Sequence, residues 1–194
     1  MKNKLLVIAL ILINFNSYSQ IDLNKTPSGF WGIDFGSSMF KVKSIMNSKS
    51  GCEISEASNS NQLVYTGGSF AGNNIYFLML EFYNDKFYNG VVSVKPSSGS
   101  ILSVYNGIIE NLTTKYSAPD KAIENYEYPY KKGDEDYETA IKVGKALIAS
   151  RWNFDNSSIT ISVSKNLSIV YDYKQNEIGN IVDKNENIKK LNDL

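Results

Sequence analysis

The sequence of 194 residues contains no histidine. This absence excludes a Ser-His-Asp triad, a Cys-His dyad and any zinc site that uses imidazole. Cys52 is the only cysteine, which excludes an internal disulfide. Because no imidazole is present to form its thiolate, we expect Cys52 to be an ordinary buried or loop cysteine.

Arginine is almost absent as well, since Arg151 is the only one. The 20 basic and 20 acidic side chains balance, and they are interspersed along the chain. A nucleic-acid-binding surface needs a stripe of basic side chains, and none appears. We therefore expect no nucleic-acid partner, and no residue pattern predicts a cofactor or a metal site.

Long hydrophobic runs are also missing. The longest apolar run, residues 5–13, is shorter than the about 20 residues that a membrane-spanning helix needs. It follows the basic start Met-Lys-Asn-Lys and precedes a polar stretch with small residues at Ser17 and Ser19, as in a signal peptide. We predict that residues 1–19 are removed on export, with a membrane anchor or a buried first helix as the alternatives. No cysteine lies near the cleavage site, so we expect a periplasmic or extracellular protein without lipid anchor or transmembrane segment.

The rest of the chain has the length of one domain. Residues 20–29 are polar and contain Pro27, which indicates a mobile leader. We place a single domain at 30–175, with halves at about 30–96 and 97–175. The charged residues 176–194 form a polar C-terminal tail that is a weak helix or disordered.

The stretch from Asn74 to Lys95 is the centre of the predicted sheet. Residues 75–83 are apolar at nearly every position, which is typical of a strand that is covered on both faces. Asn84-Asp85 suits a two-residue hairpin turn, and residues 86–94 form the second arm.

Helix and strand patterns on either side of this hairpin predict the fold class. Apolar residues at helical spacing predict helices from about Ser38 to Lys49 and from Ile101 to Tyr116. Residues 159–164 and 167–173 alternate apolar and polar positions, which predicts a hairpin with one wet face. We therefore expect an α+β fold, an antiparallel sheet built from two helix-plus-three-strand halves with the helices packed on one face.

Two short motifs resemble known envelope domains. Phe35-Gly36-Ser37-Ser38-Met39-Phe40-Lys41-Val42 resembles the helix start of small exported domains with a helix-plus-meander fold, such as the SmpA-type outer-membrane assembly lipoprotein and the β-lactamase-inhibitor-like domains. Leu112-Thr113-Thr114-Lys115-Tyr116-Ser117-Ala118-Pro119 is similar to a helix end of exported bacterial domains, with Ser117 in place of the usual glycine. The resemblance implies a fold and a compartment, and it implies no catalytic residue.

Two local motifs resemble chemical sites, but we interpret both as helix starts. Ser38 and Lys41 fit the Ser-x-x-Lys spacing of serine acyl-enzymes, but the companion motifs are absent, so we expect Ser38 to cap a helix. The acidic run 134–136 lacks EF-hand spacing, so we expect an acidic helix start with Asp134 as its cap.

Carboxylates on predicted strands are the remaining chemical candidates. Glu81 is the notable one, because it interrupts the most apolar stretch, and we take it as a candidate buried carboxylate. The alternative is a solvated position at the strand end. Asp34 and Asp172 lie on or near other predicted strands, and a pocket around Glu81 or Asp172 with a second carboxylate nearby would indicate ligand binding or hydrolysis.

Aromatic residues are the strongest sequence feature for binding. Tyr126, Tyr128 and Tyr130 fall in a predicted loop from Asp120 to Asp136, where a core has least need of them. Tyr137 and Trp152 complete this candidate surface, and the alternative is that the rings pack back on the sheet. We therefore expect an exported, non-catalytic module that binds a protein or envelope component. A small carboxylate hydrolase or small-ligand domain, or an accessory subunit of an envelope assembly, are the alternatives.

Overall fold

The computed structural model describes residues 26–192, so the predicted signal peptide lies outside the described residues. A small hairpin, β1 (Gly29–Phe30) and β2 (Ile33–Asp34), precedes the main sheet. The strands of that sheet are β3 (Glu53–Ile54), β4 (Gln62–Thr66), β5 (Ser69–Phe70), β6 (Asn73–Tyr83), β7 (Lys86–Lys95), β8 (Lys121–Tyr126), β9 (Ala146–Asn153), β10 (Ser157–Val163) and β11 (Ile169–Gln175). The helices are α1 (Met39–Met46), α2 (Ile101–Tyr116), α3 (Tyr137–Lys142) and α4 (Asn176–Asn192).

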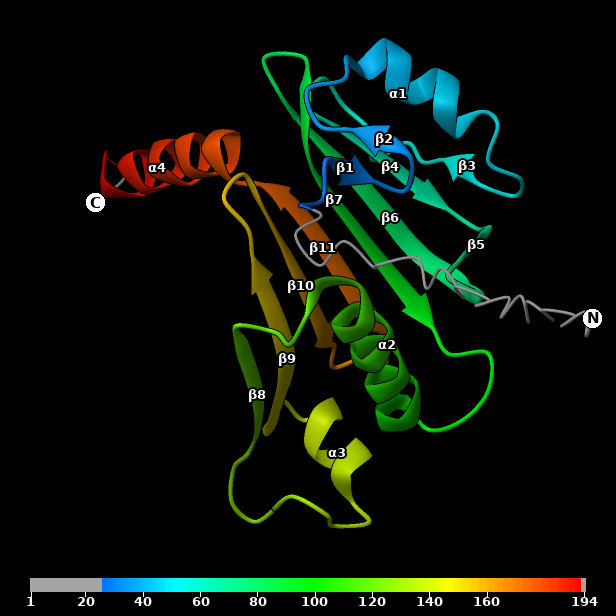
Figure 1. Ribbon diagram of the computed structural model, residues 1–194, viewed down its shortest axis with the longest axis vertical. Coiled ribbons are helices and arrows are strands. Elements are labelled where there is room, and N and C mark those ends of the chain that lie inside the picture. Colours follow the sequence, from blue (N-terminus) through cyan, green and yellow to red (C-terminus); the bar gives the residue numbers. More distant parts are fainter. Residues whose placement is uncertain (1–25, 193–194) are drawn as a thin grey trace, which may run out of the picture.

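The nine-stranded sheet has the order β3-β4-β6-β7-β11-β10-β9-β8, and β5 pairs with β6 (Figure 1). All its strand pairs are antiparallel. The prediction of an α+β fold with an antiparallel sheet is therefore confirmed. Among residues 26–192, no helix is long and apolar enough to cross a membrane.

The central hairpin forms as its sequence predicts. Asn84 (φ 49°) and Asp85 (φ 58°) both adopt left-handed backbone angles between β6 and β7. Such a turn matches the right-handed twist of the two arms, which explains why Asn and Asp stand there. The helix starts are confirmed too, because the Oγ atoms of Ser38 and Ser100 accept hydrogen bonds from the first turns of α1 and α2.

The prediction of two helix-plus-three-strand halves is wrong. Four strands of the main path precede α2 and four follow it, and pairing of β7 with β11 joins both groups into one sheet (Figure 1). The added strands are the edge strands β3 and β8, whose segments read as loops in the sequence. Both side chains of β3 and most of β8 are exposed, so neither strand shows the apolar alternation that marks a strand.

The hydrophobic core lies on one face of the sheet. Directly paired residues such as Leu78, Val92 and Tyr171 carry buried side chains on this face. The β1–β2 hairpin, α1, α2 and α3 cover it. The fully buried large side chains are Phe30, Ile33, Met46, Leu63, Leu78, Leu80, Phe87, Ile141, Trp152, Ile159, Ile161 and Ile169.

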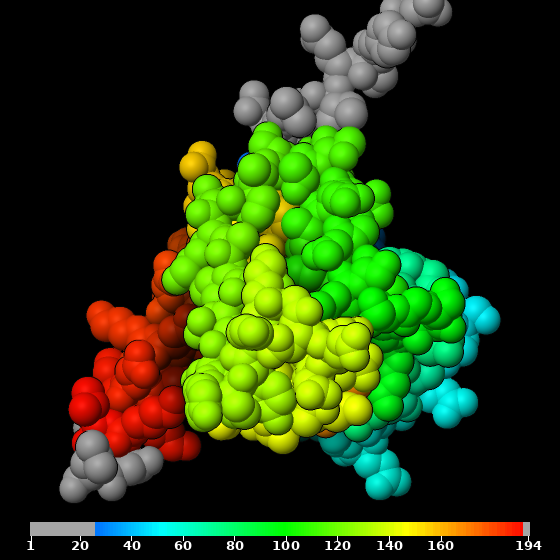
Figure 2. Space-filling view, turned by 90° about the horizontal axis from the view of Figure 1, so that it is seen from below, coloured from blue at the N-terminus to red at the C-terminus, as the bar shows by residue number. Residues whose placement is uncertain are grey.

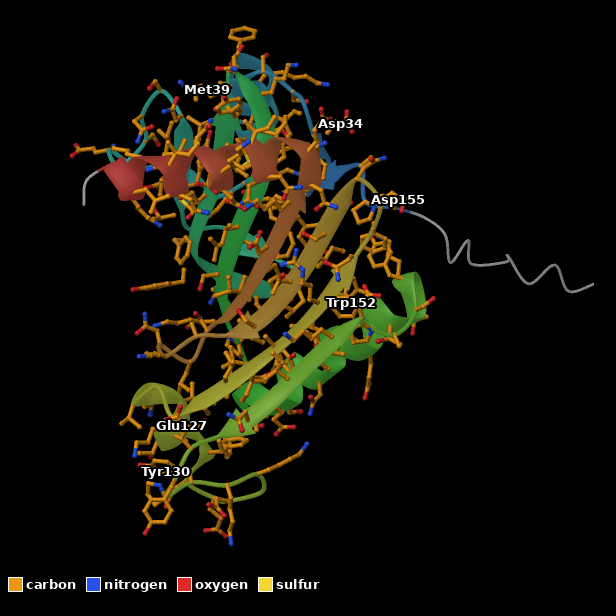
Figure 3. The ribbon with its side chains drawn as sticks, turned by 90° about the vertical axis from the view of Figure 1, so that its left-hand side faces the viewer. Asp34, Met39, Glu127, Tyr130, Trp152 and Asp155 are labelled. Atoms are coloured by element: carbon orange, nitrogen blue, oxygen red, sulfur yellow. The ribbon has the colours of Figure 1, made fainter. Side chains whose placement is uncertain are left out.

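The prediction that all helices pack on one face of the sheet is wrong. Helix α4, which forms from the predicted tail, contacts β7 and β11 from the face opposite to α2 (Figure 3). It projects from one side of the body when the molecule is seen from below (Figure 2). The reason is local: Tyr171 and Tyr173 point into the core, so Asp172 and Lys174 point to the side where α4 begins.

The expectation that residues 75–82 are covered on both faces is also wrong. Leu78 and Leu80 are fully buried, but Phe77, Met79 and Glu81 on the other face are only half-buried. Tyr76 is 49% exposed. Within residues 26–192, α4 is the one helix on this face, and it crosses one part of it (Figure 3). We call this side of the sheet the open face.

Candidate ligand site beneath helix α4

Side chains of distant segments meet in rows across the open face. Strand pairing places Val91, Asp172, Thr160 and Arg151 side by side on β7, β11, β10 and β9. The row changes from apolar to polar at Asp172, close to the middle of the sheet. The neighbouring row places Lys174 beside Ser158. The polar half of the open face thus carries both the carboxylate of Asp172 and the guanidinium of Arg151, the only arginine in the sequence.

A pocket of about 150 Å³ lies where these rows meet α4. Every side chain that lines this polar pocket is charged or carries a hydroxyl or amide group. Strands contribute one wall and α4 the other. The lining residues are Arg151, Ser158, Thr160, Asp172, Lys174, Asn176, Asn180 and Asp183.

The first turn of α4 is fixed to the sheet by hydrogen bonds. The Nδ2 atom of Asn176 donates to the carbonyl oxygens of Phe154 (2.9 Å) and Ser157 (3.2 Å). The Oε1 atom of Gln175 accepts from the backbone N–H of Ile178 at 2.7 Å, which satisfies one free amide of the helix start. These contacts aim the next turns of α4 over Asp172.

Gly179 gives Lys174 its path along the helix. A β-carbon at position 179 would lie 2.3 Å from Cε of Lys174, so any other residue there would force the lysine side chain to leave this path. Glycine inside a helix costs about 1 kcal/mol relative to alanine. The space lets Nζ of Lys174 reach both carboxylate oxygens of Asp183, at 2.8 and 2.9 Å. Asp183 is therefore neutralised within the pocket.

Arg151 is only partly engaged. Its Nε donates to Oδ1 of Asn153 (2.7 Å), and its Nη2 donates to Oγ of Ser158 (3.3 Å). Its Nη1 has no hydrogen-bond partner within the described part of the chain. The side chain is exposed at the pocket mouth, so one edge of the guanidinium remains open to a ligand.

Asp172 is the least satisfied polar group of the pocket. Its Oδ1 atom is buried and has no hydrogen-bond partner among residues 26–192. Burial raises the pKa of Asp172 above its ordinary value, and Glu81 and Asp183 add to the rise, while Lys174 and Arg151 oppose it. A buried acceptor without a partner destabilises a fold by about 1–3 kcal/mol. No contact within the described part of the fold therefore explains why a carboxylate is buried at this position.

Glu81 lies nearby on the same open face but in a different environment. It is half-buried, and its Oε2 atom accepts a hydrogen bond from Nδ2 of Asn89 at 2.7 Å. It lines a separate hollow of about 320 Å³ with Tyr88 and with Glu186 from α4. Burial and the Glu81 carboxylate raise the pKa of Tyr88.

The predicted aromatic surface is not one surface. Tyr128 is 90% exposed, Tyr130 is half-buried, and Tyr126 and Tyr137 pack against the core. Trp152 is 2% exposed, and its Nε1 donates to the carbonyl of Ser117 at 2.9 Å. Tyr130 and Trp152 lie well apart (Figure 3). A binding role for the loop tyrosines stays a prediction that now depends on Tyr128 and Tyr130.

The other sequence candidates have structural roles. Ser38 caps α1, and Nζ of Lys41 pairs with Asp34 at 3.6 Å. Cys52 is half-buried, and burial raises the pKa of its thiol, which Lys49 partly offsets. Asp134 accepts a hydrogen bond from the backbone of Lys131 in a turn, while α3 starts only after Asp136.

A larger hollow of about 350 Å³ lies on the core face beside the β1–β2 hairpin, lined in part by Phe30, Trp31, Phe70, Tyr116 and Tyr173. Phe30 stacks on Phe70 (5.4 Å between centroids) and packs on Tyr173 (5.3 Å). These rings contact each other and hold the hairpin on the sheet. Packing therefore explains this hollow, whereas it does not explain the Asp172 carboxylate.

Sequence reasoning missed most of the polar pocket. Asp172 was a candidate, but Arg151, Lys174, Asn180 and Asp183 were not. The alternation in residues 169–175 was the available signal, since it places Asp172 and Lys174 opposite to the buried tyrosines. Comparison with known proteins adds no relative: no family model, curated protein or solved structure matches the chain significantly.

Proposed function

We propose that this chain is an exported, non-catalytic binding protein of the cell envelope whose polar pocket holds a small polar ligand. The buried, unpartnered Oδ1 atom of Asp172 is the observation that supports the proposal most. Binding sites are places where a fold retains polar groups that it does not satisfy itself, at a loss in stability. A ligand that donates a hydrogen bond to Asp172 would supply the missing partner.

Binding accounts for the pocket better than hydrolysis. Hydrolysis by two carboxylates needs a second carboxyl group that is free to act as acid, base or nucleophile. Asp183 lies on the pocket wall, but Lys174 holds both of its oxygens. Export rests on the basic and apolar pattern of residues 1–19, and the resemblance to envelope domains supports the same compartment.

Replacing Asp172 with asparagine is expected to raise the free energy of unfolding of the ligand-free protein by about 1–2 kcal/mol at pH 7. The folded-state pKa of Asp172 lies above its unfolded value, so the charged carboxylate destabilises the fold at pH 7. This effect is lost as the pH falls from the folded pKa to the lower unfolded pKa. Urea denaturation of both proteins at pH 7 and pH 4 measures the gain and its loss.

Asp120→Asn is the matched control. The Asp120 carboxylate accepts a hydrogen bond from the backbone N–H of Asn153 at 2.6 Å, so it is satisfied by the fold. Its replacement is expected to lower stability rather than raise it. A loss of stability in Asp172→Asn, similar to that of the control, would show that Asp172 serves the fold and would contradict the proposed site.

A further inference from the structure

Two groups of the polar pocket that keep a polar atom without a partner among residues 26–192 have opposite charge: Asp172, where that atom is buried, and Arg151, where it is exposed. The Asp172 carboxylate has a free acceptor at Oδ1, and the Arg151 guanidinium has a free donor edge at Nη1 within the described residues. Both side chains belong to one row of the open face, with Thr160 between them. Two strand spacings separate their backbones, which is about 10 Å. A ligand that contacts both groups must carry a donor at one end and an acceptor at the other.

The other charges of the pocket cancel each other. Lys174 and Asp183 form a direct ion pair at 2.8 Å, which leaves Asp172 and Arg151 as the charges that face the remaining space. The four charged side chains sum to zero, two positive and two negative. The pocket therefore fits a ligand without net charge but with separated charges.

Three other ligand classes fit less well. A metal cation would face Arg151 and Lys174, and no group of three His, Cys, Asp or Glu side chains that could hold a metal gathers within residues 26–192. A simple anion would face the unpaired carboxylate of Asp172. A neutral polyol can donate to Asp172, but it leaves the charges of Asp172 and Arg151 without counter-charges.

The size of the pocket indicates how much of a ligand it encloses. Its volume of about 150 Å³ corresponds to about five water molecules.

Hydroxyl groups of Ser158 and Thr160 line the sheet side, and Asn180 adds an amide from α4. A guanidinium binds a carboxylate through paired hydrogen bonds, and a carboxylate binds an ammonium group by a charge-assisted one.

We infer that the polar pocket binds a small zwitterion of the free amino acid class, with the ligand ammonium group on Asp172 and the ligand carboxylate on Arg151. This inference rests on the proposed function, because it names the ligand class of the same site. The side chain of the ligand faces the hydroxyl and amide groups of Ser158, Thr160 and Asn180. The limited volume favours the smallest amino acids.

Isothermal titration calorimetry of the purified protein at pH 7 and low salt tests the inference with six probes: glycine, L-alanine, L-serine, methylammonium, acetate and glycerol. At least one of the three amino acids is expected to bind at least tenfold more tightly than methylammonium, acetate or glycerol. Asp172→Asn and Arg151→Gln are each expected to weaken that binding at least tenfold. Arg151→Lys keeps the charge but loses the guanidinium fork, so an intermediate loss is expected.

Lys189→Gln, on the exposed far end of α4, is the control and is expected to bind as the unchanged protein does. Circular dichroism shows whether each variant is folded. Tight binding of glycerol or methylammonium that depends on Asp172 would overturn the ligand class and leave the site in place. No binding of any amino acid, together with a loss of stability in Asp172→Asn, would overturn both the ligand class and the proposed function.

Discussion

Replacing Trp152 with alanine is expected to lower the free energy of unfolding by about 3–5 kcal/mol. Trp152 is 2% exposed and pairs with Ile159 across β9 and β10, so its removal leaves a large cavity in the core. The change also removes the hydrogen bond from Nε1 to the carbonyl of Ser117, at the end of α2. Because domains are stable by only about 5–15 kcal/mol, this variant should unfold at much lower urea concentration.

Two further variants separate packing from surface binding. Trp152→Phe keeps most of the ring volume and is expected to lose about 1 kcal/mol, mainly from the missing hydrogen bond. Tyr128→Ala removes a ring that is 90% exposed and should change stability by less than about 0.5 kcal/mol. Comparable stability of Trp152→Ala and Tyr128→Ala in urea denaturation would mean that Trp152 is not a core residue.

Replacing Gly90 with alanine is expected to lower the free energy of unfolding by about 3 kcal/mol. A β-carbon at Gly90 would lie 2.5 Å from Cδ1 and 2.7 Å from Cγ of Phe30, whose ring is 1% exposed. Phe30 contacts Phe70 and Tyr173, so its ring cannot move away from Gly90 without breaking these contacts. The added methyl group must therefore displace the β1–β2 hairpin from the sheet.

A double-mutant cycle checks this explanation. Phe30→Ala removes the ring and opens the space above Gly90, so Gly90→Ala should lose little further stability in that background. Urea denaturation of the four proteins gives the coupling energy between the two positions. Independent, additive losses would show that the alanine acts through the backbone of β7 and not through Phe30.

Those parts of the fold that depend on residues close together in the sequence could be predicted from it. Asn84 and Asp85 favour left-handed backbone angles, so the turn between β6 and β7 was predictable. The apolar stripe at helical spacing from Ile101 to Tyr116 predicts α2, and in the structure Ser100 caps it. The pair of strands β10 and β11, with one face exposed to solvent, also follows from the alternation of apolar and polar residues.

What could not be predicted depends on contacts between distant segments. The edge strand β8 forms because β9 offers it a free edge, from Ala146↔Tyr126 to Arg151↔Lys121, and its exposed side chains leave no pattern. The placement of α4 depends on the direction in which β11 ends. Helix α4 has few apolar residues, so its sequence did not indicate which face of the sheet it covers.

The polar pocket shows the same division. Alternation places Asp172 and Lys174 on the wet face of β11, but Arg151 comes from β9 and Asp183 from α4. Their proximity requires the sheet order and the path of α4. Glu81 interrupts an apolar stretch, but it has a hydrogen-bond partner in Asn89 on the next strand. Oδ1 of Asp172, by contrast, is buried and has no hydrogen-bond partner within residues 26–192.

The titration of the Asp172 carboxyl carbon, followed by NMR in the ligand-free protein, tests the central claim most directly. The groups that face this carboxylate are Lys174 on its own strand, Arg151 on β9, Glu81 on β6 and Asp183 on α4. Burial outweighs the two cations, so the titration midpoint is expected above the ordinary value of 3.8. A midpoint at or below 3.8 would mean that the fold already satisfies Asp172, and it would contradict a ligand site built around this group.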